Sequence, residues 1–296
     1  MTDTNGNGRT STPADTPPDT GGGAGGGERP SLGILQCGHT PEELLGLRYA
    51  NYPDLFVQML GPEAFDYRVW AVVDGEFPPD ARACDAWLIT GSRHGVYEPH
   101  DWIPPLESLI RDIRDAERPL VGICFGHQII AQALGGRVEK FAGGWSVGRV
   151  EYRLDLDGDG EGAAREAVTL PLMAYHQDQV IEPPPGAVSR GASNVCRHAA
   201  LAIGDTIRTL QPHPEFDAAF VAGLLDTRGR VLPPERYEQA VDSLKEADDV
   251  EPARAEVGRL IREFLRSGAA RHGAPATPDE SSGSVGEAPP GAARSA

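Results

Sequence analysis

A cysteine between two glycines, at the end of an apolar run, is the residue of this 296-residue chain best placed for covalent chemistry. Residues 120–123 predict a buried strand, and apolar residues at helical spacing begin at Ile129. Cys124 lies at the junction, with Gly122 and Gly126 two residues to each side, as in a nucleophile elbow with Cys in place of Ser. The glycines permit a sharp, strained turn and close packing of helix on strand. The positive N-terminal end of the helix favours the reactive thiolate, so Cys124 is predicted to be a nucleophile.

A base and an orienting acid for this nucleophile occur far downstream, in the sequence Gln-Pro-His-Pro-Glu-Phe at 211–216. A predicted strand over residues 206–210 ends in this segment, and its two prolines stiffen it. His213 and Glu215 then project at i and i+2. Glu215 can accept the proton of one ring nitrogen while the other nitrogen faces Cys124. The sequence therefore predicts a Cys-His-Glu catalytic triad.

The attack of a thiolate on a carbonyl also requires two N–H donors that stabilise the oxyanion. The backbone N–H of Phe125, directly after the nucleophile, supplies one of them. The second is expected from the loop after a neighbouring strand, Thr-Gly-Ser-Arg-His-Gly at 90–95. Gly91 lets this backbone approach the substrate, so Gly91 and Ser92 are the candidates.

Alternating strands and helices must position these residues. Short apolar runs predict strands, segments of helical period predict helices, and residues 137–210 contain strand-like pieces broken by Gly, Pro and Asp. The predicted strands span 32–35, 68–73, 86–90 and 120–123, and the predicted helices cover 52–60, 106–113 and 129–134. This alternation favours an α/β fold with a mostly parallel central sheet flanked by helices, a small antiparallel addition, and extra C-terminal helices.

The composition divides the chain into a folded unit and two tails. Residues 1–30 and 267–296 are rich in Gly, Pro, Thr, Ala and Ser, and are predicted to be disordered. The predicted catalytic domain spans 31–230, and two amphipathic faces predict a helical extension over 231–266 that packs on it.

Charge and hydropathy exclude several kinds of partner. Lys plus Arg total 27 against 44 Asp plus Glu, a formal net charge of −17, which argues against binding to nucleic acid or to an anionic membrane. The sequence contains neither an apolar stretch of the length of a membrane helix nor, over residues 1–30, the apolar core of a secretory signal. We therefore expect a soluble, cytoplasmic protein.

Cys37, Cys84 and Cys196 form no C-x-x-C pair and are expected to have packing roles.

The two motifs together resemble a known family. Gly-Ile-Cys-Phe-Gly-His-Gln at 122–128 and the late His-Pro-Glu at 213–215 are similar to the class I glutamine amidotransferases, which include the GMP synthase glutaminase domain. The resemblance covers residues 31–216. It implies the family's flavodoxin-like fold, the triad roles stated above, and a place for Gln128 near the glutamine substrate.

A third segment, Tyr-His-Gln-Asp-Gln-Val at 175–180, is similar to the His-x-Asp-x-Val stretch that lines the substrate pocket of this family. The resemblance implies that His176 and Asp178 contact substrate, with Asp178 near its α-ammonium group. The Gly91-Ser92 pair departs from the two glycines usual in synthetase-linked members. It looks more like the stand-alone branch that contains the γ-glutamyl peptidases.

Three functions are compatible with this pattern, and none of them needs a metal or an organic cofactor. In the first, the protein hydrolyses glutamine to glutamate and ammonia through a thioester and supplies the ammonia to a synthetase on a separate chain. In the second, it is a γ-glutamyl peptidase that acts on glutathione-like compounds. In the third, it is a triad-bearing binding or regulatory protein with little turnover.

Other polar groups invite weaker interpretations. Asp155 to Glu166 has the spacing of a twelve-residue calcium loop, but a predicted strand precedes it and Gly162 replaces the apolar anchor, so it is interpreted as an acidic hairpin loop. His127 is expected to face solvent or to cap a loop. His94 and His198 are interpreted as structural.

Overall fold

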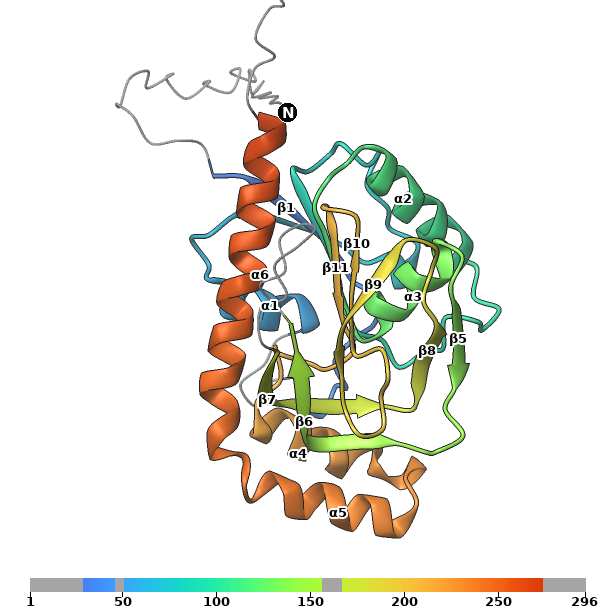
Figure 1. Cartoon of the computed structure of the whole chain (residues 1–296), viewed down its shortest axis with the longest axis vertical. Helices are drawn as coiled ribbons and strands as arrows, with labels where there is room; N and C mark the ends of the chain where they lie inside the picture. Colours follow the sequence, from blue (N-terminus) through green and yellow to red (C-terminus); the bar gives the residue numbers. More distant parts are fainter. Residues whose placement is uncertain (1–28, 46–50, 156–166, 274–296) are drawn as a thin grey trace, which may run out of the picture.

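The computed structural model describes residues 29–45, 51–155 and 167–273, which form a central sheet with helices on both faces (Figure 1). The strands of the sheet are β1 (Ser31–Leu35), β2 (Asp66–Trp70), β3 (Ala86–Ile89), β4 (Leu120–Ile123), β6 (Ser146–Leu154), β7 (Val168–His176), β9 (Ala187–Ala192), β10 (Ala200–Ile203) and β11 (Ile207–Leu210). Their order across the sheet is β2-β1-β3-β4-β11-β10-β9-β6-β7. Neighbours are parallel from β2 to β11 and antiparallel from β11 to β7. A separate antiparallel pair joins β5 (Arg137–Lys140) to β8 (Asp178–Glu182).

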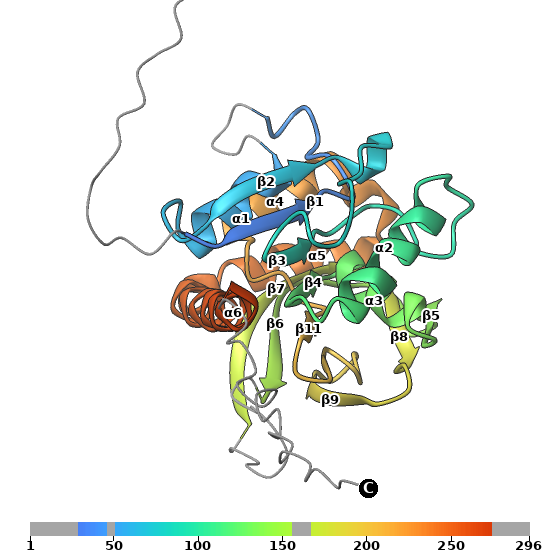
Figure 2. The same cartoon turned by 90° about the horizontal axis from the view of Figure 1, so that it is seen from above.

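Helices cover both faces of the sheet. They are α1 (Tyr52–Leu60), α2 (Ile103–Asp115), α3 (Phe125–Ala133), α4 (Ala218–Arg228), α5 (Pro234–Leu244) and α6 (Val250–Gly273). In the view of Figure 1, α4 and α5 lie below β6 and β7. Figure 2 shows α2 and α3 on one side of the parallel strands and α6 on the other. One core contains α2 and α3, a second contains α1 and α6, and a third joins α4 and α5 to β6 and β7.

Strand β3 shows why the parallel strands are apolar on both faces. Trp87 and Ile89 belong to the core under α2 and α3, whereas Ala86 and Leu88 belong to the core under α1 and α6. All four side chains are fully buried. A strand covered by helices on both sides has no solvent face and therefore no polar alternation. The predicted fold class is confirmed by this arrangement.

The antiparallel half is larger than the sequence suggested. Among the described strands, only the β5–β8 pair is a separate sheet, and the other antiparallel strands extend the central one. At the opposite edge, β2 ends at Trp70, and Val72–Asp74 forms a 3-10 helix where a continuing strand was predicted. The shorter strand still pairs with β1 over its full length.

Helix α6 continues past Arg266, where the predicted helical extension was to end, and it ends at Gly273. Leu265 and Ala269 are buried in the core that α6 shares with α1. A side chain at Gly268 would lie 2.7 Å from Pro119, so this turn of the helix is closely packed. Small residues that look like a linker in sequence therefore serve as a packing surface.

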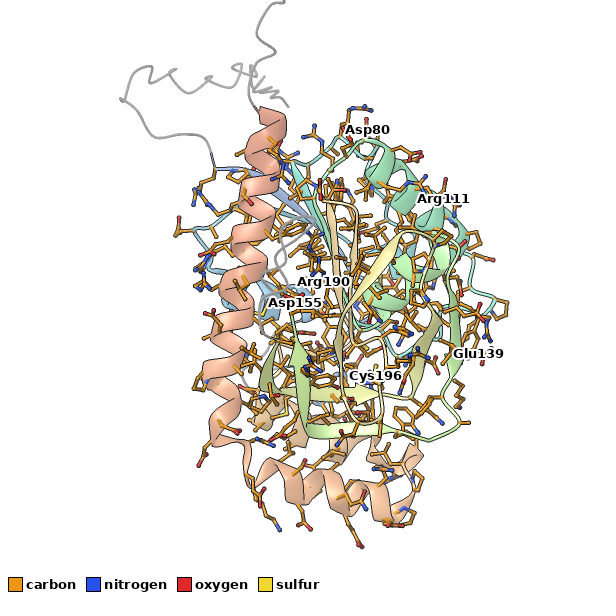
Figure 3. The ribbon with its side chains drawn as sticks, viewed as in Figure 1. Asp80, Arg111, Glu139, Asp155, Arg190 and Cys196 are labelled. Carbon is orange, nitrogen blue, oxygen red and sulfur yellow. The ribbon has the colours of Figure 1, made fainter. Side chains whose placement is uncertain are left out.

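The residues of the calcium-like loop lie outside the described part of the chain, except for Asp155. The carboxylate of Asp155 forms a 2.6 Å ion pair with Arg190 of β9 (Figure 3). Cys37, Cys84 and Cys196 are free thiols buried in the cores, which agrees with the packing roles predicted for them. Among the described helices, none has the length and apolar character needed to cross a bilayer.

Candidate active site

Cys124 lies between the end of β4 and the first turn of α3, in a strained backbone conformation. Cys124 has φ 53° and ψ −101°, a region that non-glycine residues rarely adopt. Its N–H donates to the carbonyl of Leu210 at 2.8 Å, and its carbonyl accepts from Gln128 N–H at 3.1 Å. The elbow predicted from the sequence is therefore present, and neighbouring β11 holds it in place.

The two glycines of the elbow are required by close contacts. A Cβ at Gly122 would lie 2.5 Å from the carbonyl oxygen of Gly126. A Cβ at Gly126 would lie 2.4 Å from the carbonyl oxygen of Ile89. Such separations are far inside van der Waals contact, so helix α3 can approach β3 and β4 only because both positions lack a side chain.

The segment after β11 places His213 between the cysteine and the glutamate. The His213 N–H donates to the carbonyl of Met173 in β7 at 2.8 Å. Its ring stacks on Phe216, with centroids 4.0 Å apart and planes 5° from parallel. Nδ1 lies 2.7 Å from Oε1 of Glu215, and Cys124 lies close enough to the ring to raise its pKa. The structure thus brings together all three predicted triad residues.

Electrostatics favour a charged ring at this position. Burial lowers the pKa of His213, but its interactions with Glu215 and Cys124 outweigh burial and hold this pKa well above its usual range. The side chains of His213 and Glu215 are 4% and 1% exposed, so water screens these interactions little. The arrangement therefore stabilises an imidazolium beside the cysteine sulfur.

Helix α6 reaches the triad through Arg254, a residue that the sequence interpretation missed. Arg254 Nε donates to the carbonyl of Pro214 at 2.9 Å, and Nη2 donates to the carbonyl of Glu215 at 3.0 Å. Glu251, one turn earlier in α6, forms an ion pair with the same guanidinium. Arg254 is 39 residues from Glu215 in sequence, so no local pattern could have indicated this contact.

The loop after β3 lies directly against the triad. A Cβ at Gly91 would be 3.0 Å from Cε1 of His213 and 3.8 Å from Cβ of Cys124. The hydroxyl of Thr90 accepts from the N–H of Cys37 at 3.0 Å and donates to the carbonyl of Gly91 at 3.0 Å, which ties the loop to the end of β1.

The other two candidates for the oxyanion hole lie beside this contact. Ser92 lines the same pocket as Gly91 and Cys124. Phe125 is the first residue of α3, so its N–H belongs to the free amino-terminal end of that helix. Gly91 and Ser92 therefore lie in the same pocket as Cys124, and Phe125 follows Cys124 directly in the chain.

The three candidate substrate residues meet at the start of β8. The amide nitrogen of Gln128 donates to the backbone carbonyl of Asp178 at 2.8 Å and to the side-chain oxygen of Gln211 at 3.1 Å. Asp178 accepts from the hydroxyl of Tyr97 at 3.1 Å, and burial raises the pKa of its carboxyl. Burial, assisted by the charge of His213, lowers the pKa of His176 to about 3. His176 therefore stays neutral at neutral pH.

The expectation that His127 faces solvent is wrong. His127 is fully buried, and its Nδ1 lies 2.7 Å from the hydroxyl of Thr209 in β11. Burial lowers the pKa of His127 to about 3. Residues 125–131 of α3 are all buried, so a histidine in this helix has no solvent face to occupy.

A pocket of about 600 Å³ opens above Cys124. Cys124, His213, Gly91, Gln128 and Asp178 line it, as do Ser92 and His176. Four basic side chains also line it and were not identified from the sequence: Arg93, Lys140, Arg228 and Arg230. They come from separate loops and element ends, which explains why no motif contains them.

One group among the described side chains has the composition and proximity to hold a metal ion. It consists of His94, Glu98 and His100, whose ligand atoms all lie within 4.8 Å of one another. His94 and Glu98 also line the pocket above Cys124. This group was likewise not identified from the sequence, where His94 was interpreted as structural.

Comparison with known proteins agrees with this architecture. Residues 78–219 match the family described as glutamine amidotransferase class-I. The chain is 30% identical to gamma-glutamyl peptidase 2 of Arabidopsis thaliana over 233 residues, which cover 77% of this chain and 93% of that protein. It is 30% identical to the glutamine-hydrolysing GMP synthase of Pyrobaculum aerophilum over 182 residues, which cover 60% of this chain and 31% of that protein.

A solved structure, that of a glutamine amido transferase from Methylobacillus flagellatus, superposes with a TM-score of 0.64 at 20% identity and covers 81% of this chain and 95% of that one. Fold and sequence agree: the chain belongs to the class I glutamine amidotransferase family. Within that family it is similar over most of its length to gamma-glutamyl peptidases and over a shorter region to GMP synthases.

Proposed function

We propose that this protein hydrolyses γ-glutamyl amide bonds with Cys124 as nucleophile, His213 as general acid and base, and Glu215 as the residue that orients His213. The observation that carries the proposal is the buried array of His213 with Glu215, at 2.7 Å from Nδ1, and with Cys124, which lies with His213 against Gly91. A nucleophile, a base and an orienting acid in this order are the requirements for covalent acyl transfer.

In the proposed first half-reaction, the sulfur of Cys124 attacks the γ-carbonyl carbon of the substrate and the carbonyl electrons move to oxygen. His213 then gives its proton to the departing nitrogen, the C–N bond breaks, and a γ-glutamyl thioester remains on Cys124. In the second half, His213 removes a proton from water, which attacks the thioester. Glutamate leaves, and Cys124 returns to its starting state.

The oxyanion of each tetrahedral intermediate needs donors that are in place before the reaction. The N–H of Phe125 is the first proposed donor, and the N–H of Gly91 or Ser92 is the second. The contact of Gly91 with His213 supports this assignment, because it brings the loop backbone next to the reacting groups.

The charge of the pocket favours a γ-glutamyl peptide as substrate. Such a peptide carries two carboxylates and one ammonium group, whereas glutamine carries one of each. Arg93, Lys140 and the two arginines of the α4 end can attract the additional carboxylate. Asp178 is the proposed partner of the ammonium group, which agrees with the role that the family resemblance implies for it.

Glutamine hydrolysis coupled to a synthetase on another chain is the second candidate. The similarity to the GMP synthase of Pyrobaculum aerophilum supports it. In that case the isolated chain would turn over slowly, because its partner would be needed to complete the site.

The experiment is a comparison of turnover by the purified protein on glutamine and on γ-glutamyl dipeptides, together with trapping of the thioester by mass spectrometry. We expect hydrolysis of the peptides, within the range of about 1 to 1000 per second common among enzymes. Cys124→Ala must abolish both turnover and the trapped adduct, and Cys84→Ala serves as a matched control with an intact site. Labelling of Cys124 by a glutamine-like electrophile without turnover would favour the synthetase-dependent candidate. Absence of both labelling and turnover would exclude the proposed chemistry.

A further inference from the structure

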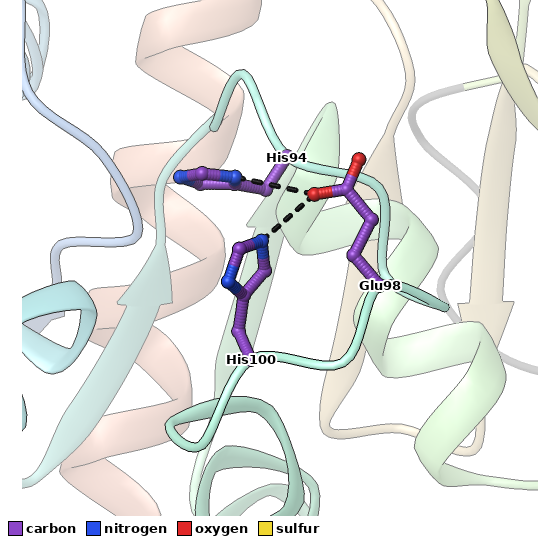
Figure 4. Close-up of side chains that lie close together, drawn as sticks. All are labelled: His94, Glu98 and His100. Atoms are coloured by element: carbon purple, nitrogen blue, oxygen red, sulfur yellow. Dashed lines mark hydrogen bonds and ion pairs between the residues drawn. The ribbon is translucent and has the colours of Figure 1, made fainter.

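The loop between β3 and α2 brings two histidines and a glutamate together at the rim of the pocket (Figure 4). Nδ1 of His94 lies 3.3 Å from Oε2 of Glu98, and Nε2 of His100 lies 2.8 Å from the same oxygen. All three side chains come from one seven-residue stretch, so the fold of a single loop creates the group.

The loop holds this group in position and leaves it open to solvent. The rings of His94 and His100 meet edge to face, with centroids 4.2 Å apart, and His100 stacks on Trp102. The N–H of Glu98 donates to the carbonyl of Gly95 at 3.1 Å, and the N–H of His100 donates to the carbonyl of Glu98 at 2.9 Å. The side chains of His94, Glu98 and His100 are 19%, 41% and 33% exposed, so an ion can reach them.

We propose that His94, Glu98 and His100 bind a divalent transition-metal ion, with Zn²⁺ as the best fit. Two imidazoles and one carboxylate form a donor set that Zn²⁺ accepts, and three protein ligands leave one tetrahedral position for water or another ligand. Bonds of about 2.0 to 2.2 Å place neighbouring tetrahedral donors about 3.3 Å apart. The separations of 2.8 and 3.3 Å to Glu98 are close to this value, and all three ligand atoms lie within 4.8 Å of one another, so the side chains need only draw together around the ion.

The alternative reading of the same group is a purely structural set of hydrogen bonds. His39 and Asp74 provide the comparison within this chain. Nε2 of His39 lies 2.9 Å from a carboxylate oxygen of Asp74, at greater exposure, and no third metal-ligand side chain among the described residues joins this pair in a group. If the loop histidines were only ion-pair partners, both groups should respond equally to Zn²⁺.

Metal binding here would act on the active site through the loop. The same loop carries Gly91 and Ser92, and the ring of Trp102 packs on Phe125 with centroids 5.4 Å apart. An ion that ties the middle of the loop together would restrict the backbone that contacts His213. Metal binding does not depend on the proposed reaction, so the test of metal binding and the test of hydrolysis can give independent results.

The test is calorimetric titration of the full-length Cys124→Ala protein with ZnCl₂. This variant removes the pocket thiol as a competing ligand. We expect one ion per chain and an increase in melting temperature on binding. Glu98→Gln and His100→Gln should each weaken binding by about tenfold or more, since even the loss of an outer-shell partner weakens metal sites by that much. His39→Gln should bind as the parent does.

Co²⁺ gives a second readout that identifies the donor atoms. In the protein with Cys124 intact, a visible d–d spectrum without a thiolate-to-metal charge-transfer band indicates nitrogen and oxygen ligands. The proposal is overturned if Zn²⁺ does not bind to the Cys124→Ala protein. It is also overturned if Glu98→Gln and His100→Gln, folded as judged by circular dichroism, bind Zn²⁺ as tightly as His39→Gln does.

Discussion

Replacement of Glu215 by glutamine isolates the role of the carboxylate in the proposed triad. The substitution keeps the size of the side chain and removes its charge. It converts a charge-assisted hydrogen bond of 2.7 Å to His213 into a neutral one in a buried site. We expect a folded protein with reduced activity, because Glu215 orients and stabilises the ring but transfers no proton itself.

The size of the reduction follows from the contacts of His213. A buried hydrogen bond to a charged group is worth about 1.5 to 3 kcal/mol, and about 1.4 kcal/mol corresponds to a factor of ten in rate. The expected loss in kcat/KM is therefore roughly 10- to 150-fold. It is not total, because the bond from the His213 N–H to Met173 and the stack on Phe216 still position the ring.

The assay is hydrolysis of a γ-glutamyl dipeptide, combined with an NMR titration of the His213 ring. Because the charge of Glu215 raises the pKa of His213, Glu215→Gln should lower this pKa. Glu182→Gln, which alters an exposed ion-paired glutamate of β8, is the matched control and should change neither quantity. A loss equal to that of His213→Ala, or an unchanged pKa of His213, would refute the assigned roles.

Three further outcomes test the structure around the site. Arg254→Met should lower kcat/KM by about tenfold or more, because two hydrogen bonds to the backbone of the triad segment are lost. Partial rescue by Arg254→Lys in the same assay would show that positioning of this segment is the cause. Gly126→Ala should lower the free energy of unfolding in urea by about 1 to 3 kcal/mol, since its Cβ meets the Ile89 carbonyl at 2.4 Å; an unchanged midpoint would contradict the packing argument. His127 and His176 have pKa values of about 3 in the folded protein, so between pH 6.5 and 3 the unfolded chain binds more protons at these residues than the folded one. The free energy of unfolding should therefore fall with decreasing pH, by up to about 1.4 kcal/mol per pH unit for each histidine. His127→Gln should reduce this slope, measured by urea denaturation at several pH values, and a slope equal to that of the parent would show that the buried ring is not its source.

The parts of the site that were predictable from sequence are those made by contiguous residues. The elbow around Cys124 is formed by one strand, one turn and one helix, so two glycines at fixed spacing were enough to indicate it. The segment with His213 and Glu215 is also short, and its prolines limit its conformations. The meeting of these two segments follows from β4 and β11 being neighbours in the sheet, which the strand pattern allowed but did not specify.

The parts that were missed depend on contacts between distant segments or on the shape of a loop. Helix α4 has apolar residues around its whole circumference, so no amphipathic period marked it. His127 looked like a surface residue because sequence does not show that α3 is enclosed. The spacing of His94, Glu98 and His100 matches no regular element, so only the folded loop brings their ligand atoms together.

The contact made by Arg254 shows that the site depends on residues outside the region matched by the family. The family match ends at residue 219, yet the backbone of the triad segment is held from α6, beyond that boundary. The same helix buries Val257, Ile261 and Leu265 against the sheet and α1, so its removal would expose an apolar face as well as release Pro214 and Glu215. A truncated protein would therefore lose stability and site geometry together, and its inactivity would not distinguish the two. Arg254→Met removes the polar contacts and leaves the apolar face of α6 intact, which makes a single side chain the better probe of how the C-terminal helix supports the proposed triad.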